Sequence, residues 1–152
     1  MTSRPKPKPE AYDAAVALLA RREHSRAELQ RKLTQREHAA DDIEAALDAL
    51  ERERLLSDAR FAEQFVRGRI ERGSGPHKIR AELRERGVAD DVVADALAGH
   101  AQAWRERVHE VRRKRFGDAV PADYRERARQ MRFLQTRGFD AEQIRAAMKD
   151  EE

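Results

Sequence analysis

The chain is predicted to be all-α, an elongated and curved array of three tandem three-helix repeats. Residues 25–33, Ser-Arg-Ala-Glu-Leu-Gln-Arg-Lys-Leu, are echoed about 50 residues later by residues 75–83, Gly-Pro-His-Lys-Ile-Arg-Ala-Glu-Leu, and a looser copy covers residues 133–148. Self-similarity at a fixed period is the signature of a repeat architecture. Ala, Arg, Glu and Leu, which all favour helices, dominate the composition. Only 39% of the residues are hydrophobic and 40% are charged, which favours thin helical layers over one deep core.

The repeats are expected to follow one another after a short extended tail. Alternating Pro residues disfavour a helix in the tail. The predicted divisions are a disordered basic tail over 1–9 and three-helix repeats over 10–54, 55–99 and 100–152.

The first repeat carries helix-start signals at two places. Ser25 with Glu28 three residues later forms a capping box, and Asp41 with Glu44 repeats that pattern. Apolar residues at helical spacing predict the buried positions. They are Tyr12, Ala15, Val16, Leu18, Leu19, Leu29, Leu33, Ile43, Leu47 and Leu50.

The second repeat is delimited by caps and glycines. Ser57 precedes its first helix, Pro76 suits the first turn of its second helix, and Gly87 is a natural stop for that helix. Asp90 or Asp91 begins the third helix. The expected core positions are Phe61, Phe65, Val66, Ile70, Ile79, Leu83, Val93 and Leu97.

The third repeat opens near His100. Gly117 and Gly138 are expected to end its first two helices, and Asp140 with Gln143 to cap its last. The apolar positions along these helices are Trp104, Val108, Val111, Met131, Leu134, Ile144 and Met148.

The sequence lacks the residue patterns of an enzyme, a metalloprotein or a membrane protein. There is no Cys, the five His have no ligand spacing, and Ser25 and Ser57 are explained as helix caps. Residues 73–78 resemble a phosphate loop but lack the Gly-Lys-Ser/Thr ending. No apolar run approaches the roughly 20 residues of a membrane helix, and no secretory signal is recognised. We therefore expect a cytoplasmic, non-enzymatic protein without cofactor or metal.

Charge is unevenly distributed along the chain. Residues 100–137 carry eleven Arg and Lys and five Asp and Glu, a net charge of +6, whereas residues 38–60 have a net charge of −4. The basic residues could be a solvated face that interacts favourably with helix dipoles. They could equally contact phosphates or an acidic protein surface, because the Arg fork binds both. The candidate binding residues, chosen from charge, are Lys78, Arg80, Arg112, Arg113, Lys114, Arg115, Arg125, Arg129 and Arg132.

Several longer motifs occur in order along roughly residues 12–148. They are His-Ser-Arg-Ala-Glu-Leu at 24–29 with Lys32 and Leu33, Leu-Leu-Ser-Asp-Ala-Arg-Phe-Ala at 55–62 with Phe65, Val66 and Arg69, Gly75-Pro76 with Ile79, Glu82, Leu83, Gly87 and Val88, and Phe133-Leu134 with Arg137, Gly138 and Phe139. Together these motifs resemble the bacterial RecX family. One position departs from the family's pattern, because Glu37 stands where the family tends to have the Gly that ends the second helix of the first repeat.

The resemblance implies a tandem of three-helix repeats and a function as a modulator, mostly an inhibitor, of the RecA recombinase. Proteins of this family bind in the groove of the RecA–DNA filament and suppress ATP hydrolysis, strand exchange and co-protease activity. The resemblance therefore implies that this chain is a regulator of DNA repair, recombination and the SOS response, with the RecA filament as its partner. A monomer is expected. The alternative is a helical module that binds single- or double-stranded DNA without sequence preference.

Overall fold

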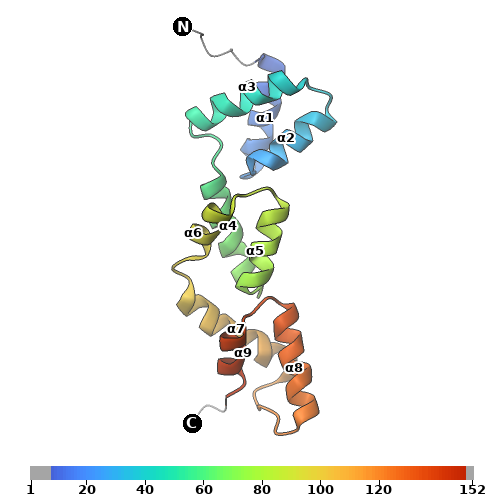
Figure 1. Cartoon of the computed structure of the whole chain (residues 1–152), viewed down its shortest axis with the longest axis vertical. Helices are drawn as coiled ribbons and strands as arrows, with labels where there is room; N and C mark the ends of the chain where they lie inside the picture. The colour runs from blue at the N-terminus through green and yellow to red at the C-terminus, as the bar shows by residue number, and fades with distance from the viewer. Residues whose placement is uncertain (1–7, 150–152) are drawn as a thin grey trace. The chain divides into compact units, whose positions relative to one another are not determined.

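The structure is a computed structural model that describes residues 8–149, and all the regular structure in these residues is helical (Figure 1). The all-α prediction is confirmed. The helices of the described residues are α1 (Pro9–Arg21), α2 (Arg26–Gln35), α3 (Ala40–Arg52), α4 (Asp58–Glu71), α5 (Pro76–Glu85), α6 (Asp90–Leu97), α7 (Ala101–Phe116), α8 (Tyr124–Thr136) and α9 (Ala141–Ala147). None of these helices is long and apolar enough to cross a membrane. The predicted tail lies mostly outside the described residues, and α1 starts at Pro9 in its first turn.

The chain divides into two compact units. The first unit comprises the residues up to Gln64 together with Arg84–Val93, and the second comprises Phe65–Leu83 together with the residues from Ala94 onward. Each unit therefore holds one complete terminal triplet of helices, α1–α3 or α7–α9. The middle triplet, α4–α6, is shared, because the division falls inside its helices.

The first unit is built around the apolar faces of α1, α2 and α3. The predicted capping box starts α2, since the Ser25 hydroxyl accepts from the Glu28 backbone N–H and the Glu28 carboxylate accepts from the Ser25 N–H. The second predicted box is wrong: α3 follows Ala39 without a side-chain cap, which places Asp41 in the first turn, where its charge favours the helix dipole. The buried cluster consists of Ala15, Leu18, Leu29, Leu33, Ile43, Leu47, Leu50 and Leu56.

The second unit has its own apolar cluster, formed by α7, α8, α9 and the turn after α8. Asp140 and Gln143 form the predicted capping box at the start of α9. On α8, Leu134 is buried as expected, but Met131 is 37% exposed and lies outside the core. The cluster consists of Val108, Leu134, Phe139, Ile144, Ala147 and Met148.

In the first unit, the start of α2 meets the turn after α5; we call this contact the first junction. The Ser25 hydroxyl donates a 2.7 Å hydrogen bond to the Arg86 carbonyl oxygen. Gly87 lies next to Ala27, and a Cβ atom at Gly87 would overlap the Ala27 Cβ. A side chain from one helix triplet therefore reaches the backbone of the next.

In the second unit, the start of α5 meets the turn after α8; we call this contact the second junction. Backbone meets backbone here: the Gly75 N–H donates to the Arg137 carbonyl at 2.7 Å, and the His77 N–H donates to the Gly138 carbonyl at 2.9 Å. A Cβ atom at Gly75 would overlap the backbone of Gly138 and Phe139. Positions 25 and 75, which the sequence repeat places in register, thus occupy equivalent places in the two junctions.

A left-handed residue ends the second helix of every triplet. The backbone φ angle is +76° at Gly87 and +100° at Gly138, a region that favours glycine. Glu37, at the matching place in the first triplet, has a φ angle of +66°. The departure from the family's pattern therefore changes the residue and leaves the turn as it is in the other triplets.

Candidate partner-binding groove

The basic cluster that ends α7 is divided by the helix into side chains with different surroundings. Successive residues on an α-helix point about 100° apart, so four consecutive cations cannot share one face. Arg112 is only 3% exposed. Its guanidinium donates to the carbonyl of Asp118 at 3.0 Å and to those of Gly117 and Ala119 at 3.4 Å.

Arg112 therefore holds the loop between α7 and α8 and has no surface to offer a partner. Arg112 was chosen as a candidate from its charge alone, and its burial corrects that choice. No local pattern distinguishes it from its neighbours, because its acceptors are three backbone carbonyls of a loop and the side-chain oxygen of Gln130 on α8. The other three cations of the cluster, Arg113, Lys114 and Arg115, are exposed.

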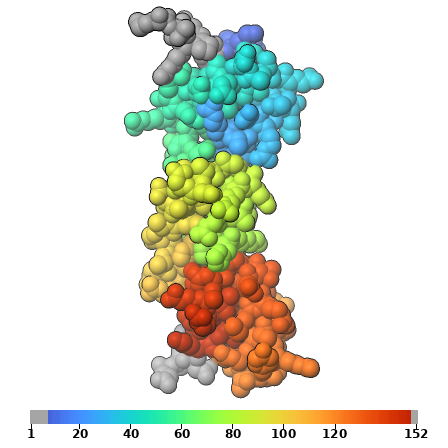
Figure 2. Space-filling model, in the orientation of Figure 1, coloured from blue at the N-terminus to red at the C-terminus, as the bar shows by residue number. Residues whose placement is uncertain are grey.

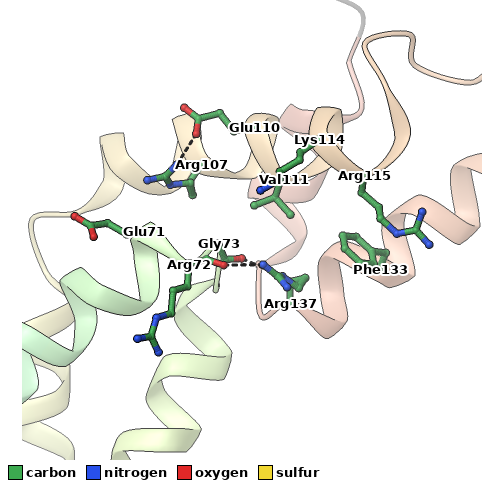
Figure 3. A pocket seen from close by; sticks show the side chains of 10 residues that line it. All are labelled: Glu71, Arg72, Gly73, Arg107, Glu110, Val111, Lys114, Arg115, Phe133 and Arg137. Atoms are coloured by element: carbon green, nitrogen blue, oxygen red, sulfur yellow. Dashed lines mark hydrogen bonds and ion pairs between the residues drawn. The ribbon is translucent and has the colours of Figure 1, made fainter.

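Two of these cations, Lys114 and Arg115, line a groove in the second unit (Figure 3). The groove has a volume of about 380 Å³ and lies among the end of α4, the turn that follows it, α7 and the C-terminal part of α8. Arg113 lines a different cavity, beside His109 and Asp118. The groove is lined by Glu71, Arg72, Gly73, Arg107, Glu110, Val111, Lys114, Arg115, Phe133 and Arg137.

The floor of the groove is held by Arg137. Its Nη2 donates to the Arg72 carbonyl at 2.8 Å and its Nε to the Gly73 carbonyl at 3.2 Å. Figure 3 shows the Arg137 guanidinium beside Arg72 and Gly73. Arg137 thus fixes the turn after α4 against the end of α8. Arg137 was not among the candidate binding residues, although it lies in the third copy of the repeat.

The groove carries an excess of positive charge. Of its two carboxylates, that of Glu110 pairs with Arg107 at 2.6 Å. Within residues 8–149, the side chains of Arg72 and Lys114 have no hydrogen-bond or ion-pair partner. An anion entering the groove would therefore meet cations that are not already neutralised.

Two aromatic rings lie among these cations. Phe116 and Phe133 pack edge to face, with ring centroids 5.2 Å apart. The Arg115 guanidinium lies 5.2 Å from the Phe116 ring centroid and 5.7 Å from that of Phe133. The guanidinium of Arg129, on α8, lies 5.0 Å from the Phe116 ring centroid. Cation–π contacts of this kind orient arginine side chains without neutralising them.

The three predicted arginines of α8 also differ in their surroundings. Arg129 forms two hydrogen bonds to the Glu126 carboxylate, at 2.9 and 2.7 Å. These bonds, followed by one from Gln130, lower the pKa of Glu126 to about 2, so the pair stays ionised. Arg125 and Arg132 are exposed, and their side chains have no ion pair within the described part of the chain.

Lys78 and Arg80 lie on α5, away from the groove lining. The Lys78 backbone and Cβ pack beside Gly138 in the second junction. Arg80 is half-buried and its Nη1 lies 3.4 Å from Nδ1 of His77. The structure therefore brings together Lys114 and Arg115 with three arginines that were not predicted, Arg72, Arg107 and Arg137, and leaves the other candidates outside the groove.

Family models match all three helix triplets. The models of the first, second and third three-helix domains of RecX match residues 11–50, 57–97 and 105–148, respectively. The chain belongs to the RecX family. The family consists of regulatory proteins and not of enzymes, and the resemblance predicted from the motifs is confirmed.

Individual RecX proteins are similar over most of their length. The regulatory protein RecX of Chromohalobacter salexigens is 57% identical over 136 residues, which cover 90% of this chain and 89% of that protein. RecX of Halorhodospira halophila is 53% identical over 135 residues, covering 89% and 84%. The crystal structure of RecX from Lactobacillus salivarius shares the fold, with a TM-score of 0.80 at 24% identity over 91% of this chain and 92% of that one.

Proposed function

We propose that this protein binds the RecA–DNA filament and inhibits the recombinase, ATPase and co-protease activities of RecA, and so modulates DNA repair and recombination. The observation that carries the proposal is the match of all three helix triplets to the three RecX domains. The exposed cations of the second unit add support, because a filament of protein and DNA presents both carboxylates and phosphates. Arg and Lys bind either group.

Within this function, Lys114 and Arg115 in the groove and the neighbouring Arg113 are proposed as contacts to the filament. The three are exposed and consecutive. Lys114 has no partner among the described residues, and Arg115 is oriented by two aromatic rings. Lys78, Arg80, Arg125, Arg129 and Arg132 stay candidates for further contacts to the filament, whereas Arg112 is withdrawn because it is buried.

The test is titration of the protein into a RecA–single-stranded DNA ATPase assay and a strand-exchange assay. Inhibition at or below a stoichiometric ratio to RecA is expected. The variant Arg113→Glu/Lys114→Glu/Arg115→Glu should need at least about tenfold more protein for the same inhibition. Failure of the unmodified protein to inhibit either reaction would contradict the proposed function.

A matched control separates the site from the net charge. Arg21, Arg36 and Arg52 are exposed cations of the first unit. Their reversal to Glu changes the net charge by the same amount as reversal of the α7 cations. Inhibition should be retained in the control. If both triple variants lose inhibition equally, the assignment to α7 is wrong while the function stands.

A second candidate function is direct, sequence-independent DNA binding, favoured by the two groove cations that have no intramolecular partner. Each phosphate contact would make the affinity for single-stranded DNA fall with salt, with a slope of roughly −0.7 per contact in a double-logarithmic plot. Measuring this slope without RecA, for the unmodified protein and the α7 variant, tests the candidate. A slope near zero would exclude it.

A further inference from the structure

The outward face of α8 combines an apolar row with a basic row. Tyr124, Ala128 and Met131 are four and three residues apart, which places them on one side of the helix. Tyr124 is 83% exposed and Met131 is 37% exposed. Together with Leu55, they are the large apolar side chains that the structure describes as exposed. Figure 2 shows α8, in orange, at the surface of the molecule.

The basic row runs beside the apolar one. Arg125 and Arg132 are seven residues apart, two helical turns, and both are exposed. The carboxylate of α8, Glu126, is occupied by Arg129 and Gln130 and so cannot neutralise them. Any partner that covers this face must therefore bring its own negative charges.

The residue types on this face favour a protein over a nucleic acid as the partner. Tyr, Met and Arg are the types enriched in the centres of protein–protein interfaces, where Lys is depleted, and α8 contains no Lys. A phosphate backbone would satisfy the arginines but would leave Met131 and the Tyr124 ring in water. An exposed apolar row of this kind gains free energy only when another apolar surface covers it.

We propose that this face of α8 binds an acidic protein segment, whose apolar side chains cover Tyr124 and Met131 and whose carboxylates pair with Arg125 and Arg132. The two rows extend for about 10 Å along the helix, which suits a segment of about two helical turns. The inference rests on the proposed function, because the segment is taken to belong to the protein component of the RecA–DNA filament. Within the second unit, it assigns a contact with the protein part of the filament to α8, in addition to the contacts proposed for the α7 cations.

The experiment compares two variants that change one row each. Tyr124→Gln/Met131→Gln removes the apolar row while keeping good helix formers and the charge. Arg125→Gln/Arg132→Gln removes the basic row. Affinity for RecA–single-stranded DNA filaments and for bare single-stranded DNA is measured for each at two salt concentrations. Leu55→Gln, at the other large exposed apolar side chain (47% exposed), is the matched control.

The apolar-row variant should bind filaments about tenfold more weakly or worse, with unchanged salt dependence and unchanged affinity for bare DNA. The basic-row variant should also lose filament affinity and become less sensitive to salt. Leu55→Gln should match the unmodified protein in every measurement.

The following results would overturn the inference. Undiminished filament binding by the apolar-row variant would show that the row is not covered. An equal loss on bare DNA would make α8 a nucleic-acid surface. If the unmodified protein inhibits RecA while neither variant differs from it, only the inference falls; if the unmodified protein neither binds filaments nor inhibits RecA, the proposed function falls with it.

Discussion

The two junctions solve the same packing problem in different ways. At the first junction a serine hydroxyl bridges to the Arg86 carbonyl, and a small side chain, Ala27, fills the space beside Gly87. At the second junction there is no room for a side chain, and the backbone N–H groups of Gly75 and His77 bond directly to the facing turn. The equivalent positions 25 and 75 are thus a serine and a glycine. The size of the side chain at this position determines how closely the helix start approaches the facing turn.

The largest effect is expected at the second junction, from Gly75→Ala. Its Cβ would overlap backbone atoms of Gly138 and Phe139, which cannot rotate aside as a side chain can. We expect the free energy of unfolding to fall by about 3 kcal/mol, measured by urea denaturation followed by circular dichroism. Gly68→Ala on α4, where the added Cβ meets no atom within 4 Å, is the control and should be neutral or slightly stabilising. Similar losses in both variants would contradict the close approach.

The next largest effect is expected from Gly87→Ala at the first junction. The variant combines an unfavourable φ of +76° with an overlap onto the Ala27 Cβ. We expect a loss of about 2 kcal/mol in the same denaturation experiment.

The double variant Gly87→Ala/Ala27→Gly separates the two causes. It removes the overlap and keeps the backbone strain, so about half of the loss should return after correction for the Ala27→Gly single variant. If the double variant recovers no stability, the overlap with Ala27 does not contribute to the loss in Gly87→Ala.

A loss of about 1.5 kcal/mol is expected from Ser25→Ala. The substitution removes the cap of α2 and the hydrogen bond to the Arg86 carbonyl together. Asp140→Ala removes a similar capping box at α9, where the carboxylate oxygen accepts from the Gln143 N–H. The difference between the two losses in the free energy of unfolding, measured by thermal and urea unfolding, estimates the contribution of the Ser25–Arg86 hydrogen bond to stability. Equal losses would mean that this bond contributes nothing.

A gain of about 1 kcal/mol is expected from Glu37→Gly, because a glycine adopts the left-handed conformation without Cβ strain. The Glu37 side chain is exposed, so its removal uncovers little buried surface. A loss of stability in urea denaturation would show that the Glu37 side chain has a favourable role that outweighs the strain.

The smallest expected effect is a dependence of stability on pH at the first junction, which has a titratable residue, His24, where the second junction has Ser74. His24 is buried next to Ser25; its Nδ1 lies 3.0 Å from the Arg22 carbonyl and its Nε2 lies 2.9 Å from the Lys32 ammonium. Burial above all, with the nearby Arg22 and Lys32 charges, lowers the pKa of His24 below its ordinary value of 6.5. The neutral ring therefore donates through Nδ1 and accepts from Lys32 through Nε2.

A lowered pKa makes the unfolded chain bind the proton more readily than the folded one. The contribution of His24 is fully present above pH 6.5 and is lost as the pH falls from there through the lower pKa of the folded state. Urea denaturation between pH 7 and pH 5 should show this loss in the unmodified protein and less of it in His24→Gln. Ser74, the matching residue at the second junction, does not titrate. An identical pH dependence in the variant would assign the effect to another group.

Local signals in the sequence predicted the scaffold well. The capping boxes at Ser25 and Asp140 and the stops at Gly87 and Gly138 depend on neighbouring residues alone, and each was found where the pattern indicated. The false box at Asp41 shows the limit of such signals, since acidic residues are equally favourable in the first turn of a helix.

The groove could be predicted only in part, because its residues meet through tertiary packing. The charge pattern identified Lys114 and Arg115, but it also selected Arg112, which is buried and donates to loop carbonyls and to Gln130. Arg72 and Arg137 are distant in sequence and meet through a hydrogen bond from a guanidinium to a backbone carbonyl, for which no residue pattern exists. The exposure of Met131 was likewise hidden, because an apolar residue at helical spacing reads as core.

The second junction has a consequence for exchanging modules between members of the family. Gly75 and Gly138 lie in different helix triplets. The Gly138 backbone excludes a side chain at position 75, and Lys78 of α5 excludes one at position 138. A chimera that grafts the last triplet of one protein onto the first two of another would join two surfaces selected separately. A chimera that folds should take the start of α5 and the turn after α8 from the same protein. The second junction, and not the helix triplet, is therefore the part that has to be exchanged as a whole.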